Sequence, residues 1–242
     1  MSGEACYCFK NNKLMKKNPL SSEELLCNFY TLTNIISQRK AIREYNSQKI
    51  PAELVEKVIK IACRAPSWYG LEPWFILAIS EEKTKQDLYP FFNRQKQVIN
   101  CSHLFLILSY GGEAFNWETD LFKRKILWKY NRLTEETYLE FCQKSLSLFD
   151  PTQPKKISIW ARQQCFILLQ NFLLLWTSLN FATSPMGGFR EKKVIDYLEQ
   201  NKLISAGKYN LAVSFAVGYP LKIELWKKEV QEKDWKGVFK II

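Results

Sequence analysis

The stretch APSWYGLEPWFILAIS, residues Ala65 to Ser80, carries most of the information about the fold. Pro66 lacks an amide hydrogen and therefore ends a preceding helix, whereas Gly70 permits a tight turn. The apolar run from Trp74 to Ile79 then predicts a buried strand. A helix-to-strand turn so rich in small and aromatic residues raises the question of what lies against it.

Helical and apolar patterns on both sides of this stretch predict an α+β fold with one central mixed sheet flanked by helices. Residues 1–20 show no periodicity and are interpreted as a loose N-terminal tail, and residues 21–242 as a single domain with a C-terminal arm. Helices are expected to end just before Arg39 and to start at Pro51. Further strands are expected at residues 103–110, 181–184 and 211–217, and their continuous apolar character is typical of a sheet covered on both faces.

Composition and length exclude several classes of protein. With 242 residues and 47% hydrophobic residues, the chain can bury a full core and is not disordered. No run reaches the roughly 18 apolar residues that cross a bilayer, and the first residues lack the apolar centre of a secretory signal. We therefore expect a cytoplasmic protein without a membrane partner.

The cysteines and the single histidine argue against metal and triad chemistry. Seven scattered cysteines in a reducing compartment are expected to be free thiols. Cys6 and Cys8 lack further ligands at metal-binding spacing, so we expect no metal site. His103 opens an apolar strand, which favours a packing role over a catalytic one.

The net charge of +11 indicates an anionic partner. A phosphate-bearing cofactor uses the same charges as nucleic acid, and a basic surface without any such partner is commoner than either.

One long segment, SIWARQQCFILLQNFLLLWTSLN, predicts a central buried helix, because it is apolar almost all round. Gln163, Gln164, Gln170 and Asn171 fall on one stripe of this helix. Buried amides need hydrogen-bond partners. The stripe fits contacts within the core, contacts across a dimer, or a cofactor contact, and the residues alone leave these open.

Four segments carry candidate binding chemistry. They are the basic segment SQRKAIREY (Ser37–Tyr45), the opening turn, the segment NRQKQVINCSH (Asn93–His103) and the loop TSPMGGF (Thr183–Phe189). The last lets backbone approach a flat ligand but matches no standard nucleotide loop.

Taken together and in this order, these segments resemble the FMN-dependent nitroreductases, particularly the oxygen-insensitive NAD(P)H type. The similarity extends over about residues 24–220 and includes the closing strand VSFAVGYP. It implies a nitroreductase-like fold, an intertwined homodimer and FMN as cofactor, with NAD(P)H as cosubstrate. The apolar helix at residues 157–179 independently calls for a partner surface.

The resemblance also assigns roles to residues. It implies that Arg39, Lys40 and Ala41 hold the FMN phosphate and ribityl chain, and that Arg43 faces the pyrimidine edge of the flavin. Pro66, Ser67 and Trp68 match a turn that borders the ring from the partner subunit, and Gln164 matches a glutamine near the ribityl chain. The other implied cofactor-binding residues are Arg94, Gln97, Pro185, Met186, Gly187, Gly188, Lys227 and Lys228, with the backbone of Gly187 near flavin N5.

The sequence departs from the family pattern at several of these positions. Ala41 and Trp68 replace serines, so their side-chain hydrogen bonds are lost, and Gly187 replaces a glutamate while it keeps its backbone N–H. Arg94 takes the place of an asparagine, and an insertion of one residue would shift it and Gln97.

The function implied is ping-pong transfer of two electrons from NAD(P)H through FMN to nitroaromatic or quinone acceptors, without a catalytic side chain. One alternative keeps the fold but reduces another acceptor, such as an enone, a pteridine or a free flavin. Another is a non-catalytic basic protein that binds nucleic acid, which has little motif support, so nucleic acid is not an expected partner. A fold that has lost FMN is a further possibility, given Ala41, Trp68 and Gly187.

Overall fold

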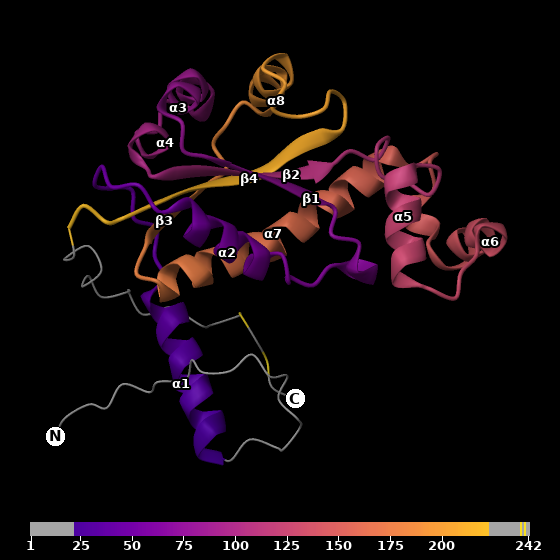
Figure 1. Cartoon of the computed structure of the whole chain (residues 1–242), viewed down its shortest axis with the longest axis horizontal. Helices are drawn as coiled ribbons and strands as arrows, with labels where there is room; N and C mark the ends of the chain where they lie inside the picture. Colours follow the sequence, from indigo (N-terminus) through magenta and orange to yellow (C-terminus); the bar gives the residue numbers. More distant parts are fainter. Residues whose placement is uncertain (1–21, 223–237, 239, 241–242) are drawn as a thin grey trace.

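The structure is a computed structural model that describes residues 22–222, 238 and 240. A four-stranded sheet is flanked by helices on both faces (Figure 1). The strands are β1 (Trp74–Ile79), β2 (His103–Tyr110), β3 (Ala182–Met186) and β4 (Tyr209–Gly218). The helices are α1 (Ser22–Gln38), α2 (Ala52–Ala62), α3 (Glu82–Leu88), α4 (Gln97–Asn100), α5 (Asp120–Lys129), α6 (Glu135–Ser145), α7 (Pro154–Ser178) and α8 (Glu191–Gln200).

The four strands lie in the order β1-β2-β4-β3, and each neighbouring pair is antiparallel. The expected α+β fold is confirmed, but the expectation of a mixed sheet was wrong, because the four strands pair only in the antiparallel sense. Within the described residues, the parallel pairing is an isolated bridge between Ala41 and Thr183. This bridge matters for function because it fastens the basic segment to the edge strand β3.

Both faces of the sheet are covered, as the apolar strands predict. Helices α7 and α2 lie on one face, and α3, α4 and α8 lie on the other (Figure 1). Phe105 and Phe215 stack on the α7 face with ring centroids 4.6 Å apart, and Phe172 of α7 packs against both. The sheet is therefore a rigid central layer on which the surrounding loops are mounted.

Helix α7 is less completely buried than its composition suggests. Its inner side packs on the sheet, but Ile159, Phe166 and Ile167 are 60%, 50% and 41% exposed. The four amides are not buried either: Gln163 and Gln170 are exposed, and Gln164 and Asn171 are partly so. The prediction of a buried helix was thus wrong for the outer face of α7, because an apolar pattern does not reveal what covers each side.

A separate aromatic cluster packs against the N-terminal end of α7. Helices α5 and α6 stand beside the sheet there (Figure 1). Phe115, Phe122 and Phe149 are fully buried. Phe115 and Phe149 pack with Trp160 of α7, and Phe122 packs with Phe149. Trp128, in contrast, is 87% exposed.

Helix α1 extends away from the sheet (Figure 1). Its large apolar side chains Leu25, Leu26, Phe29, Tyr30, Leu32 and Ile36 are all more than half exposed. The helix ends one residue before Arg39, as predicted. The expected tail at residues 1–20 and the expected C-terminal arm, which includes Lys227 and Lys228, lie outside the described residues apart from Val238 and Lys240.

Strand β3 covers only part of β4. It pairs with residues Ser214–Gly218, whereas β2 pairs with β4 from Tyr209 onward. The edge of β4 at residues 209–213 therefore has no neighbouring strand among the described elements on the β3 side.

Candidate functional site

The predicted binding residues that the structure describes fall into two groups. We call Arg39–Arg43, Asn93–Gln97 and Pro185–Gly188 the loop half of the site. We call Pro66–Trp68 together with Gln164 the turn half.

The loop half centres on the end of β3. A cavity of about 480 Å³ is lined there by Pro185, Met186 and Gly187 of the loop, by Ala212 and Val213 of β4, and by Arg162, Phe166, Leu169, Phe189 and Glu191. A Cβ atom added to Gly187 would meet nothing within 4 Å. The backbone of this loop therefore borders open space, as contact with a flat ligand requires.

The third segment fixes this loop through amide side chains. Asn93 Nδ2 and Gln95 Nε2 donate to the carbonyl oxygen of Gly188 at 3.2 and 3.0 Å. Gln97 Nε2 in turn donates to Gln95 Oε1 at 3.0 Å. The family resemblance implied that Arg94 and Gln97 bind the cofactor. In the structure, Asn93 and Gln95 contact the loop instead, and Arg94 is exposed.

The basic segment reaches the same strand. Ala41 bridges Thr183, and the Ile42 N–H donates to the Thr183 carbonyl oxygen at 2.9 Å. Arg39 is partly buried and Arg43 is exposed, and neither forms an ion pair with a residue that the structure describes. Two guanidinium groups are thus held near β3 with their donors available for an anion.

Two buried hydroxyl groups of β3 lack hydrogen-bond partners. The side-chain oxygens of Thr183 and Ser184 are buried without a hydrogen-bond partner in the described part of the chain. Leaving such a group unpaired costs about 1–3 kcal/mol. Because neighbouring residues of a strand face opposite sides of the sheet and both oxygens are covered by protein, these groups are not placed to contact a ligand together.

The turn half is built on strained backbone. Tyr69, Gly70 and Glu72 have φ values of 54°, 59° and 46°, in the left-handed region where non-glycine residues are rare. Ser67 stabilises the turn, because its hydroxyl accepts a hydrogen bond from the Glu72 N–H at 2.9 Å. The opening turn is thus held in a defined shape.

Gln164 of α7 belongs to this turn half. Its Oε1 atom accepts a hydrogen bond from the Trp68 N–H at 3.1 Å. The Trp68 ring packs with Tyr69, Phe149 and Trp160 at centroid distances of 5.1, 5.8 and 6.4 Å, yet it stays 46% exposed. The turn half therefore presents an aromatic wall to solvent.

The two halves use opposite sides of α7. Arg162 and Phe166 line the cavity of the loop half. In a helix of 3.6 residues per turn, Gln164 lies about 200° around the axis from each of them. A flat ligand in the loop half of one chain therefore cannot also lie against the turn half of that chain.

Two buried groups of the core, His103 and Cys101, have shifted pKa values. Burial lowers the pKa of His103 to about 4 and raises that of Cys101 to about 11. The His103 ring lies 2.9 Å from the Ser102 hydroxyl through Nδ1 and packs with Phe105, as its predicted packing role requires. No group of three or more His, Cys, Asp and Glu side chains is placed to hold a metal ion among residues 22–222.

None of the helices formed by the described residues is both long and apolar enough to cross a membrane.

Comparison with known proteins bears on this site. Residues 36–219 match the Nitroreductase family. A Haemophilus influenzae protein provisionally named an NAD(P)H nitroreductase is 26% identical over 221 residues, which cover 86% of this chain and 93% of that protein.

Solved structures share the fold. A provisionally described nitroreductase in complex with FMN from Exiguobacterium sibiricum has a TM-score of 0.69 and 16% identity, and the match covers 87% of this chain and 97% of that chain. CLA-ER, an enone reductase of gut-bacterial fatty-acid metabolism, has a TM-score of 0.69 and 17% identity with the same coverage of each chain. The family match spans most of the chain and includes both halves of the site, so the chain belongs to the nitroreductase family.

Proposed function

We propose that this protein is an FMN-dependent NAD(P)H oxidoreductase that passes two electrons to nitroaromatic or quinone acceptors. The observation that carries the proposal is the open slot beside Gly187, with the basic segment fastened to the strand that leads into it. A flat ring with an anionic tail is the ligand that this arrangement fits.

The residues present fit FMN. The cavity of about 480 Å³ offers backbone and apolar surface for a ring, and Arg39 and Arg43 offer donors for a phosphate and for the polar ring edge. Bound FMN would supply the redox chemistry by taking hydride from NAD(P)H and passing the electron pair to the acceptor.

The chain supplies binding and charge. Arg39, Lys40 and the backbone of Ala41 would hold the phosphate and ribityl chain. Arg43 would place a positive charge beside the pyrimidine edge, where negative charge accumulates on reduction, and a preorganised charge there favours the reduced ring. The Gly187 N–H would donate to the ring nitrogen N5.

The turn half would come from a second copy of the chain. Because the two halves lie on opposite sides of α7, a homodimer lets the aromatic turn of each copy close the slot of the other. The exposed apolar side chains of α1, together with Ile167 of α7, which lines none of the described cavities, provide surface for such a dimer. Lys227 and Lys228 remain proposed phosphate contacts.

Selection of the acceptor would depend on the slot beside Gly187. Gly187 offers no carboxylate to a substrate, so shape and stacking would select the acceptor. An enone acceptor is the second candidate, since the fold is shared with an enone reductase.

The proposal can be tested with the purified protein after incubation with FMN and removal of the excess. We expect a bound flavin spectrum that NADH or NADPH bleaches without oxygen, and recovery of the colour on adding nitrofurazone or a quinone. Riboflavin, which lacks the phosphate, should bind more weakly. Protein that stays colourless under these conditions contradicts the proposal, and recovery only with an enone would replace the acceptor class.

A salt-dependent interaction with polynucleotide by a colourless protein would instead favour the nucleic-acid alternative.

A further inference from the structure

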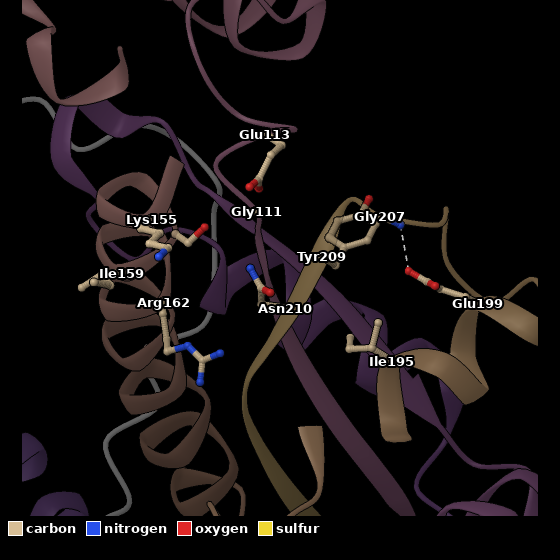
Figure 2. A pocket seen from close by; sticks show the side chains of 11 residues that line it. Gly111, Glu113, Lys155, Ile159, Arg162, Ile195, Glu199, Gly207, Tyr209 and Asn210 are labelled. Carbon is tan, nitrogen blue, oxygen red and sulfur yellow. Dashed lines mark hydrogen bonds between the residues drawn. The ribbon is translucent and has the colours of Figure 1, made fainter. Parts of the chain in front are cut away.

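A second cavity follows the open edge of β4. It has a volume of about 620 Å³ and lies between α7, α8 and residues Tyr209 and Asn210 of β4. We call it the β4-edge groove and define it by Lys155, Ile159, Arg162, Ile195, Tyr209 and Asn210. Figure 2 shows Lys155 and Arg162 projecting from α7 on one side and Ile195 from α8 on the other. None of these residues belongs to the loop half or the turn half.

The groove adjoins the slot beside Gly187. Arg162 lines both cavities, and Glu191 lines the slot and a smaller pocket that shares Ile195, Tyr209 and Asn210 with the groove. From Leu169 in the slot to Lys155 in the groove, α7 rises about 21 Å. A ligand with one ring in the slot therefore has room to extend along the edge of β4.

The α7 wall of this groove is basic. Lys155 is exposed and forms no ion pair within residues 22–222. Arg162 Nη2 lies 2.6 Å from Glu191 Oε1, and this ion pair crosses from α7 to α8. The two side chains are 40% and 34% exposed, so solvent weakens their attraction and another anion can compete for Arg162.

The opposite wall is partly acidic. Glu199 Oε1 accepts a hydrogen bond from the Gly207 N–H at 2.8 Å, and Glu113 projects toward the groove (Figure 2). Carboxylates are common partners of ribose hydroxyls. An anionic group is thus favoured along α7, and hydroxyl groups are favoured across from it.

We propose that the β4-edge groove binds the diphosphate and adenosine half of the nicotinamide dinucleotide, with Arg162 and Lys155 as its phosphate contacts. The inference rests on the proposed function, because it requires the nicotinamide ring to stack on a flavin held in the slot. Arg162 exchanges Glu191 for a phosphate, which its planar guanidinium can hold with two hydrogen bonds. Lys155 lies two turns away on the same side of α7 and adds a second charge.

The direct test measures binding of ADP-ribose to the FMN-loaded, oxidised protein by calorimetry. ADP-ribose carries the diphosphate and adenosine but has no nicotinamide, so its binding reports on the groove and not on hydride transfer. We expect Lys155→Ala and Arg162→Ala each to weaken binding about tenfold, as for loss of a charge-assisted hydrogen bond. Glu191→Gln releases Arg162 and should strengthen binding.

Lys156→Ala is the matched control. Lys156 is the next residue of α7, is exposed, lines none of the described cavities and bonds to Gln153. Its loss removes the same charge from the same helix turn and should leave binding unchanged. Equal weakening by Lys155→Ala and Lys156→Ala would reduce the effect to general charge and overturn the proposal.

The same variants separate this inference from the proposed function. With NADH, the concentration that half-saturates flavin reduction should rise in Lys155→Ala and Arg162→Ala. In Lys155→Ala, whose side chain lines the groove but not the slot, the limiting rate should stay close to that of the wild type. If NADH bleaches the flavin normally, and its half-saturating concentration is the same in the variants as in the wild type, the result contradicts the groove assignment but not the proposed function. Protein that never takes up FMN contradicts both.

A strand of a second copy is the rival occupant, because the open edge of β4 could pair with it. In that case ADP-ribose would not bind, and the Arg162 substitution would shift the dimer equilibrium seen by light scattering. That result would overturn the proposal.

Discussion

The loop half and the turn half are built by different means. The loop half offers backbone, amides and cations: Gly188 is held by Asn93 and Gln95, and the basic segment bonds to β3 through Thr183. The turn half offers rings and strained backbone, with Trp68 packed among aromatic side chains. The loop half can orient a ligand through polar contacts, and the turn half can stack aromatic rings on it. Neither half supplies both kinds of contact.

The difference gives α7 a clear role. The helix separates the halves within one chain, and it contributes Phe166 to one and Gln164 to the other. Under the proposed function, a single copy would therefore carry two incomplete sites, and the exposed apolar residues of α1 and α7 would lie against a second copy. The following predictions test whether the halves differ as proposed.

The largest effect is expected from removing the cations of the loop half. Arg39→Ala with Arg43→Ala removes two charge-assisted hydrogen-bonding groups, each worth about 1.5–3 kcal/mol. We expect the dissociation constant of FMN to rise by about 100-fold or more, measured by flavin fluorescence. Lys57→Ala with Lys83→Ala, at exposed lysines of α2 and α3, is the control of equal charge. A similar loss in both variants would mean that net charge alone attracts the flavin.

Protonation of His103 in β2 should lower the free energy of unfolding of the whole chain, and it should therefore affect both halves of the site. Because burial holds the pKa of His103 near 4 instead of 6.5, the unfolded chain binds this proton more readily. Stability from this group is complete above about pH 6.5 and is lost as the pH falls toward 4, by up to about 3 kcal/mol.

Urea unfolding at pH 7 and pH 4.5 measures this loss. In His103→Gln, the decrease in unfolding free energy from pH 7 to pH 4.5 should be smaller by the amount that His103 contributes. An identical pH dependence in the two proteins would show that another group controls acid stability.

A smaller effect is expected from the turn half. Gln164→Ala leaves the Trp68 N–H without its acceptor and loosens the turn, so FMN binding should weaken about tenfold. Gln163→Ala removes a neighbouring, exposed amide and should have no effect. Binding that is insensitive to Gln164 would break the comparison, because the turn would then play no part in the site.

The smallest effect is expected from the amides that hold the loop. Asn93→Ala with Gln95→Ala frees the Gly188 carbonyl, and the added freedom of the loop should slow flavin reduction only a few-fold. Arg94→Ala lies between them and should not change the rate. If the Arg94 variant is the slower one, the role predicted from the sequence is correct and the loop contacts are incidental.

The sequence was sufficient where local signals are strong. The bounds of β1 and β2 were predicted correctly, since each is a continuous apolar run between breaking residues. The family motifs also placed the loop and the turn. These features depend on neighbours in the chain and can be recognised without knowing the packing.

Other features depend on geometry that a pattern does not contain. Asn93 and Arg94 both have φ near 53°, so the backbone turns there and directs the amides of Asn93 and Gln95 to Gly188. Arg162 was missed because it carries no motif, and its place between two cavities arises only when α7 and α8 pack along β4. The outer face of α7 was misjudged for a similar reason.

The central claim, that each flavin site combines two copies, can be measured in mixed dimers. One copy carries Arg39→Ala with Arg43→Ala, the other carries Trp68→Ala with Gln164→Ala, and two different affinity tags isolate the heterodimer after coexpression. One site of the heterodimer then has both halves intact. We predict about one tightly bound FMN per heterodimer, whereas each variant alone retains little; a heterodimer that retains no more FMN than its parents contradicts the account.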